Sequence, residues 1–366
     1  MVLPTLGCTK DDLDTPSLCV DLDILESNTR FVAATCQKYN VQWRPHSKCH
    51  KSPAIARKLL EAGAVGMTCA KLGEAEVLCG GGVHNLLVAN LVVGSKKLQR
   101  LVALRRETDV IVCVDHREQA EAFSRAMSGA GLTLRLLIEV DIGMQRVGVS
   151  PGEPALALAR HIDRLPGVQL AGVMGYEGHL LTVKDPREKE ARIREAIGTL
   201  VDTRRTIEQA GLPCPIVSCG GTGSFPYAVC QPGITEMQAG GAIFMDAYYR
   251  YGCQIRDMDF ALTVLATVVS RPTPERAVID AGRKTLNVDI HPAFVLGRPD
   301  IVVEQLSAEH GKLRLEPSAQ GLRIGDRLEI VPGYSDLTCV LHDRFLGFRG
   351  DRLEVIWPLT ARGLLQ

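Results

Sequence analysis

The chain has 366 residues, enough for an α/β barrel of about 250 residues and a second domain. Hydrophobic residues make up 46% of it and aromatic residues only 5%, which suits an aliphatic α/β interior. Lys plus Arg and Asp plus Glu each total 42, so the formal net charge is zero. A neutral chain lacks the positive field that attracts nucleic acid or anionic lipid, so we exclude both as partners.

Three features of the sequence bear on its compartment. No stretch approaches the ~20 apolar residues that a membrane-spanning helix needs. The N-terminal sequence MVLPTLGCTKDDLDTP has no basic segment followed by an apolar one, so we expect no secretory signal. The twelve cysteines show no CxxC spacing, which argues against a zinc knuckle or a redox motif. We therefore expect a cytoplasmic protein with reduced thiols.

From about residue 41 onward, apolar β-branched runs alternate with segments of helical periodicity. The runs predict eight strands, at residues 41–43, 64–69, 85–89, 109–115, 134–140, 169–174, 215–219 and 234–238. The helical pattern is evident at residues 52–60, 96–104 and 188–210. Such alternation indicates a parallel sheet, and a count of eight favours a closed (β/α)8 TIM-type barrel over an open doubly wound sheet.

After about residue 258 the pattern changes to short strands without helices between them. These strands are predicted at residues 261–269, 277–280, 312–316, 327–331, 345–348 and 353–357. Arg349-Gly350-Asp351 lies between the last two and is typical of a hairpin turn. We expect a barrel domain at residues 22–257 and a β-rich domain made of residues 1–21 and 258–366, which the run at 17–21 would join.

A basic segment, Arg44-Pro45-His46-Ser47-Lys48-Cys49-His50-Lys51, directly follows the first barrel strand. In such barrels the carboxyl ends of the strands carry the active site. A lysine held there among other cations can act as an amine nucleophile that forms a Schiff base. For an arbitrary lysine-rich loop, a solvated surface would be the better interpretation, but the position favours function.

The second signal is Gly220-Gly221-Thr222-Gly223-Ser224, just after the seventh strand. Glycines let backbone N–H groups approach an anion, and the hydroxyls add donors. Phosphate sites after strands seven and eight recur in barrels, although a glycine-rich loop alone is often only a turn. A lysine at one strand end and a phosphate loop at another match the two ends of pyridoxal phosphate (PLP), whereas no GxGxxG opens a helix to bind a dinucleotide.

These segments resemble the D-threonine aldolase and D-serine dehydratase family of fold-type III PLP enzymes, which have an alanine-racemase-like barrel and a β domain. The resemblance covers nearly the whole chain. Besides the basic segment and the glycine loop, it rests on Asp14–Ser17 (DTPS), Glu139–Gly143 (EVDIG), Thr235–Gly240 (TEMQAG) and Val331–Asp343.

The resemblance implies roles for individual residues. Lys48 would carry the cofactor, and Gly221, Thr222, Gly223 and Ser224 would hold its phosphate. Arg146 would neighbour the cofactor's ring oxygen, and Tyr176 would lie near its pyridine ring. The resemblance also implies a homodimer and a small amino acid as substrate.

One difference from the family pattern concerns a metal. Family members carry a His-x-Asp or His-x-Cys pair that binds a divalent metal, and here the stretch reads Tyr334-Ser335-Asp336. Asp336 matches the family, but Tyr334 replaces the histidine, and one carboxylate is a thin basis for a transition-metal site. We therefore expect the metal to be absent, with Asp336 as the one remaining candidate ligand.

Without a metal, a side chain must deprotonate the substrate. His179, in Tyr176-Glu177-Gly178-His179 after the sixth strand, is a candidate general base because imidazole titrates near neutrality. It is nearly as consistent with a surface loop histidine. Tyr334 is the other candidate.

Three classes of function stay open. The leading one is a PLP-dependent lyase that cleaves small D-3-hydroxy amino acids by a retro-aldol reaction to glycine, or a similar amino acid, and an aldehyde. A dehydratase is a variant of it. The second is an amino-acid racemase using Lys48 and an opposing tyrosine or histidine. The third is a non-catalytic cofactor-binding protein, which the large β domain disfavours.

Overall fold

The computed structural model describes residues 3–366. They form two compact units. One, the β unit, comprises the chain up to Phe31 together with Gly241–Arg362; the other, the barrel unit, comprises Val32–Gly240 and Gly363–Gln366. None of the helices within residues 3–366 is long and apolar enough to cross a membrane.

The barrel unit is built on eight parallel strands, each of which falls within or beside a run predicted above. They are β2 (Gln42–Trp43), β3 (Met67–Cys69), β4 (Leu86–Leu91), β5 (Val110–Val114), β6 (Leu134–Glu139), β7 (Val168–Met174), β8 (Ile216–Cys219) and β9 (Glu236–Met237). Their order in the sheet is β2-β9-β8-β7-β6-β5-β4-β3.

The two ends of this order also meet, which closes the sheet. A parallel bridge joins His46 to Thr68, just beyond β2 and within β3. The Val65 N–H donates to the Trp43 carbonyl at 2.9 Å, and the Thr68 N–H donates to the Pro45 carbonyl at 2.9 Å. The predicted (β/α)8 barrel is therefore confirmed, with the basic segment at its closing seam.

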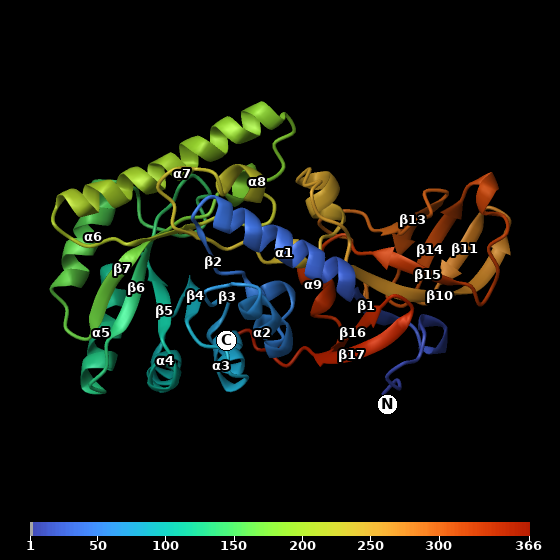
Figure 1. The fold of residues 1–366 in the computed structure, drawn as a ribbon, viewed down its shortest axis with the longest axis horizontal. Coiled ribbons are helices and arrows are strands. Elements are labelled where there is room, and N and C mark those ends of the chain that lie inside the picture. Colours follow the sequence, from blue (N-terminus) through green and yellow to red (C-terminus); the bar gives the residue numbers. More distant parts are fainter. Residues whose placement is uncertain (1–2) are drawn as a thin grey trace. The chain divides into compact units, whose positions relative to one another are not determined.

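Helices alternate with these strands and lie on the outside of the sheet (Figure 1). They are α1 (Leu22–Lys38), which begins in the β unit, α2 (Pro53–Glu61), α3 (Leu72–Gly80), α4 (Ser95–Glu107), α5 (Arg117–Gly129), α6 (Glu153–Asp163), α7 (Pro186–Gln209) and the short α8 (Phe225–Ala228).

Helix α7 illustrates how local sequence sets these boundaries. Its N-cap, Asp185, accepts a hydrogen bond from the Glu188 N–H at 2.8 Å, and Pro186 occupies the first turn, where no N–H is needed. The helix ends before Gly211, which has a φ of +81°. Its buried face includes Ile193, Ile197 and Leu200, at helical spacing.

The β unit contains the other nine strands. They are β1 (Ser17–Asp21), β10 (Leu262–Thr273), β11 (Arg276–Ile279), β12 (Phe294–Val295), β13 (Ile301–Leu306), β14 (Gly311–Leu315), β15 (Arg327–Val331), β16 (Arg344–Arg349) and β17 (Arg352–Pro358). Strand β1 pairs antiparallel with β10 and parallel with β16, so the N-terminal run does join this sheet.

The predicted hairpin is confirmed, because β16 and β17 pair antiparallel around Gly350, which has a φ of +58°. The β unit also contains the one-turn helix α9 (Ser335–Cys339) and a π-helical turn at Tyr248–Gly252. Strands β12 and β13 were not predicted.

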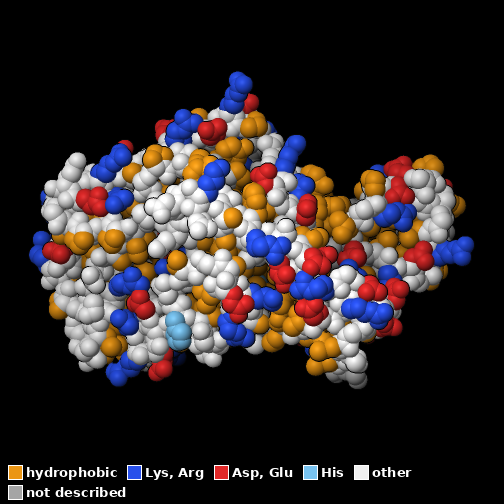
Figure 2. Space-filling model, in the orientation of Figure 1, with side chains coloured by type: hydrophobic (Ala, Val, Ile, Leu, Met, Phe, Trp, Pro, Cys, Tyr) orange, Lys and Arg blue, Asp and Glu red, His pale blue; other side chains and the backbone are white. Residues whose placement is uncertain are grey.

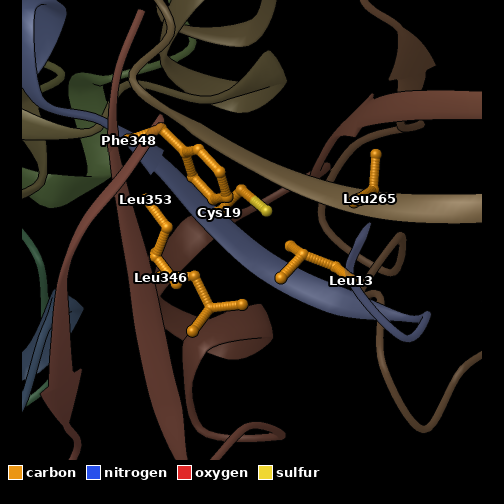
Figure 3. Close-up of a cluster of buried hydrophobic side chains, with 6 residues drawn as sticks. All are labelled: Leu13, Cys19, Leu265, Leu346, Phe348 and Leu353. Atoms are coloured by element: carbon orange, nitrogen blue, oxygen red, sulfur yellow. The ribbon is translucent and has the colours of Figure 1, made fainter. Parts of the chain in front are cut away.

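Buried hydrophobic side chains hold the sheet of the β unit together. Figure 3 shows one such cluster, in which side chains from β1, β10, β16 and β17 meet a residue of the N-terminal segment: Leu13, Cys19, Leu265, Leu346, Phe348 and Leu353. At the surface, acidic and basic side chains are interspersed over the face shown in Figure 2, in keeping with the zero net charge.

Candidate active site

The basic segment leaves β2 and forms a short 3-10 turn, Ser47–Cys49, which presents Lys48. The His46 Nδ1 caps this turn by accepting a hydrogen bond from the Lys48 N–H at 3.3 Å. On the other side, a Cβ added at Gly240 would lie 2.2 Å from the His46 carbonyl oxygen, so only glycine fits there. The backbone around Lys48 is thus fixed from two sides.

Positive charge gathers around His46. Burial is the main reason that the pKa of His46 is well below its usual range, and the nearby cations Lys48, Lys51 and Arg146 lower it further. The ring is therefore neutral, and Lys48 and Arg146 contribute positive charge near it. Such a site favours an anionic ligand.

Lys51 is held in an ion pair inside the protein. It is buried and forms an ion pair with Glu74, which is fully buried at the start of α3. The second oxygen of Glu74 accepts hydrogen bonds from the N–H groups of Ala70 and Lys71. This pairing leaves Lys48 as the better candidate for the nucleophile.

A buried polar network, which the sequence did not reveal, lies inside the barrel near the closing seam. Arg44 donates from Nε to Glu236 at 2.7 Å and from a terminal nitrogen to the Asn85 carbonyl at 2.7 Å. The other oxygen of Glu236 accepts from the Ser218 hydroxyl at 2.7 Å, and Gln238 donates to that hydroxyl at 2.8 Å. The network ties β2, β8 and β9 together beneath the basic segment and the glycine loop.

The glycine loop follows β8 and needs its glycines. Gly220 has a φ of +81°, and a Cβ there would lie 2.3 Å from the Met237 sulfur. A Cβ on Gly221 would lie 3.0 Å from the ring of Tyr176, so the predicted phosphate loop and the predicted ring neighbour are in contact. The Ser224 hydroxyl bonds back to Gly221, accepting from its N–H and donating to its carbonyl, both at 3.2 Å.

The Thr222 hydroxyl, unlike that of Ser224, has no hydrogen-bond partner in the described chain. Thr222 is buried, with 3% of its surface exposed. Buried hydroxyls are normally paired, because an unmade bond costs about 1–3 kcal/mol. An unpaired hydroxyl in a glycine loop fits the oxygen of a bound phosphate.

Arg146 and Glu139 approach this site from the end of β6. The Arg146 guanidinium lies 5.8 Å from the centre of the Tyr176 ring and 3.8 Å from a Glu139 oxygen. Burial raises the pKa of Glu139 to about 7, and Arg146 opposes that shift. The other Glu139 oxygen is buried without a hydrogen-bond partner in the described chain.

Together these groups fit PLP. The structure brings Arg146, Tyr176 and Gly221 into contact, and both Lys48 and Arg146 lie close enough to His46 to shift its pKa. The donor set of an amine nucleophile, a guanidinium and a hydroxyl without a partner matches an aldehyde, a ring oxygen and a phosphate.

His179 lies on the surface side of this region. Its side chain is exposed, and its ring covers Gly143, where a Cβ would lie 2.9 Å from Nε2. It lines a cavity of about 210 Å³ with Arg192 and Glu195 of α7. Partial burial and Arg192 lower the pKa of His179, while Asp141 opposes them. A neutral imidazole is the form that can accept a proton.

Tyr334 and Asp336 belong to the β unit, where they contact each other. The Tyr334 hydroxyl donates to Asp336 Oδ2 at 2.9 Å. The Tyr334 ring also packs edge-on against Tyr248 and Tyr249, with centroids 5.5 and 5.8 Å apart. Over residues 3–366, no group of three or more His, Cys, Asp or Glu side chains is arranged to hold a metal ion.

Asp246 fixes the backbone next to Tyr334. It is fully buried and accepts hydrogen bonds from the Ser335 N–H at 2.8 Å, the Ser335 hydroxyl at 2.7 Å and the Tyr249 N–H at 2.8 Å. Burial raises the pKa of Asp246 to about 7 despite these bonds. His342, six residues after Asp336, is hydrogen-bonded through Nε2 to the Thr285 carbonyl at 2.8 Å.

Comparison with known proteins identifies the family of this chain. The model of the alanine racemase N-terminal domain matches residues 20–248, more than half of the chain. The chain belongs to this family. A second model, for a serine dehydratase domain, matches residues 261–348.

Several relatives are similar over almost their whole length. A D-threonine aldolase of Arthrobacter is 37% identical, with 96% of this chain and 93% of the relative covered. A 3-hydroxy-D-aspartate aldolase of Paracoccus denitrificans is 35% identical, with 99% and 95% covered. The crystal structure of a D-threonine aldolase from Filomicrobium marinum superposes with a TM-score of 0.96 at 39% identity, covering 99% of both chains. The predicted family and fold class are confirmed.

Proposed function

We propose that this chain is a PLP-dependent lyase that cleaves small D-3-hydroxy amino acids into glycine, or a similar small amino acid, and an aldehyde. The observation that carries the proposal is a lysine and a glycine loop with an unpaired hydroxyl, in a barrel similar to two aldolases over 93% and 95% of their length. In this reaction the Cα–Cβ bond breaks, the β-hydroxyl loses its proton, and Cα gains one.

The residues divide the work. Lys48 would hold the cofactor covalently, the loop Gly221-Thr222-Gly223-Ser224 would hold its phosphate, Arg146 its ring oxygen and Tyr176 its ring. When bound, PLP supplies an electron sink for the negative charge that develops at Cα. The chain's own task is to bind the substrate, orient the breaking bond and move protons.

A base must take the proton of the β-hydroxyl. His179 is one candidate, because its pKa is lowered and its ring is open to solvent, and Tyr334 is the other. Asp336 accepts a hydrogen bond from Tyr334, where the family pattern has a metal-binding histidine. We propose that the reaction does not depend on a bound metal and that the protein works as a cytoplasmic homodimer.

Product analysis tests the proposal. Purified protein loaded with PLP is incubated with D- and L-threonine and with 3-hydroxyaspartate, and aldehyde, keto acid and enantiomers are measured. We expect an aldehyde and glycine from the D-substrates alone. Keto acid with ammonia would make the protein a dehydratase, and inversion of an amino acid without cleavage would make it a racemase.

A further inference from the structure

Glu177, which follows Tyr176 and precedes His179, has no evident role in the reaction as described so far. Its side chain is completely buried, and neither carboxyl oxygen has a hydrogen-bond partner within residues 3–366. A buried carboxylate with neither a paired cation nor a hydrogen bond of normal geometry is costly in free energy. A bound ligand that hydrogen-bonds to this carboxyl would offset the cost.

The surroundings of Glu177 place it beside the glycine loop. The Ser224 hydroxyl and the Gly220 N–H face its carboxyl and favour the charged form, without forming a hydrogen bond of normal geometry. Cys219, the last residue of β8, is the titratable neighbour on that strand, and Glu177 helps to raise its pKa. None of these neighbours is a cation.

Burial outweighs the nearby donors, so the pKa of Glu177 is raised. A raised pKa means that the carboxyl holds its proton more firmly than an exposed glutamate does. A protonated carboxyl has one O–H donor, whereas an ionised one has none. Next to a phosphate dianion, the ionised form would also repel.

We infer that Glu177 is part of the phosphate-binding subsite, where it acts as a neutral acid that donates a hydrogen bond toward the loop and its anion. Thr222 supplies an independent observation, because its buried hydroxyl also lacks a partner in the same loop. Two buried polar groups without partners, Glu177 beside the glycine loop and Thr222 within it, support a subsite for a phosphate monoester. The inference rests on the proposed function, since PLP is the phosphate ester concerned.

The test compares PLP with pyridoxal, which lacks the phosphate. Full-length protein is stripped of cofactor, and the affinities for both compounds are measured by absorbance titration for wild type, Glu177→Leu and Glu177→Gln. Glu177→Leu should bind PLP about 10- to 100-fold more weakly, the loss expected for one hydrogen bond to a charged group, and pyridoxal as before. Glu177→Gln keeps a neutral donor and should bind PLP like wild type. Glu190→Gln, on the exposed side of α7, is the control.

The pH dependence provides a second readout. As the pH rises through the raised pKa of Glu177, wild type should lose affinity for PLP relative to Glu177→Gln, which cannot ionise. Three results would overturn the inference: equal losses for PLP and pyridoxal, unchanged PLP binding in Glu177→Leu, or Glu177→Gln as weak as Glu177→Leu. A wild-type protein that binds neither compound would instead refute the proposed function itself.

Discussion

The barrel mouth and the Tyr334–Asp336 pair of the β unit differ in how their polar side chains are hydrogen-bonded. At the barrel mouth, Thr222, Glu139 and Glu177 have buried oxygens without partners in the described chain. In the β unit, Tyr334 hydrogen-bonds to Asp336, at the place where the family pattern has a metal-binding pair. Because buried polar atoms without partners cost free energy, they persist where a ligand completes them. The unpaired atoms at the barrel mouth are therefore available to a ligand, whereas Tyr334 hydrogen-bonds to Asp336 within the protein itself.

The largest effect should come from Lys48. Lys48→Arg keeps the positive charge but cannot attach the cofactor covalently, so turnover should fall below detection while the fold is retained. The measurement is aldehyde release under saturating PLP. Lys96→Arg, the same change at an exposed position of α4, should leave turnover within a factor of two of wild type. Substantial turnover in Lys48→Arg would mean that another amine carries the cofactor.

The next effect tests the two candidate bases, Tyr334 of the β unit and His179 of the barrel unit. Tyr334→Phe or His179→Ala should lower turnover by roughly 10²–10⁴, the usual contribution of a general acid or base. Whichever variant shows the loss identifies the base. Tyr251→Phe, in the same unit and exposed, is the control for Tyr334→Phe.

Metal removal tests whether the Tyr334–Asp336 pair has replaced a metal site. Exhaustive chelation should leave wild-type activity essentially unchanged, whereas Tyr334→His should gain a bound divalent metal that elemental analysis detects. Its occupancy should decrease at acidic pH, because the new imidazole must be neutral to bind. Loss of wild-type activity on chelation, with recovery on adding manganese or zinc, would contradict a metal-independent reaction.

A smaller effect is expected at the phosphate loop. Thr222→Val removes the unpaired hydroxyl and should weaken PLP binding about 10- to 100-fold, since hydrogen bonds to charged groups contribute about 1.5–3 kcal/mol. Adding Ser224→Ala should weaken it further, because that hydroxyl holds Gly221 in place. Thr206→Val on α7, whose hydroxyl bonds within the helix, should bind PLP normally. Unchanged affinity in the double variant would locate the phosphate elsewhere.

The smallest effect concerns stability and pH. The pKa of Glu139 is raised from 4.5 to about 7 in the folded protein, so the folded state holds this proton more tightly than the unfolded chain does. The free energy of unfolding should therefore fall as the pH rises from about 4.5 to 7, and this contribution should vanish in Glu139→Gln. In urea denaturation, the free energy of unfolding of Glu139→Gln minus that of wild type should increase by roughly 1–3 kcal/mol between pH 4.5 and pH 8. A difference that stays constant with pH would show that Glu139 ionises normally.

Much of the barrel was predictable because its strands are buried on both sides and appear as apolar runs. All eight were located, although β3 begins at Met67 rather than at residue 64. Residues 64 and 65 come directly after Gly63, which has a φ of +103°. The Val65 N–H donates to the Trp43 carbonyl, whereas the pairing of β3 with β4 begins only at Met67. In the β unit, β12 has only two residues and β13 carries Glu304 and Gln305, so neither shows a clear strand pattern.

The site was partly predictable for a similar reason. Lys48 and the glycine loop stand directly after strands, so their place at the barrel mouth follows from the fold. The burial of Glu139 and Glu177, and the Arg44–Glu236 pair inside the barrel, depend on which strands become neighbours. Spacing along the chain contains no signal for such contacts between β2 and β9.

The attachment of the cofactor to one lysine is the most direct test of the proposed site. The protein is loaded with PLP, reduced with borohydride and digested, and the modified peptide is identified by mass spectrometry. The modification should fall on Lys48, within the segment between β2 and α2. Modification of Lys51, or of a lysine outside this segment, would contradict the assignment of the barrel mouth as the active site.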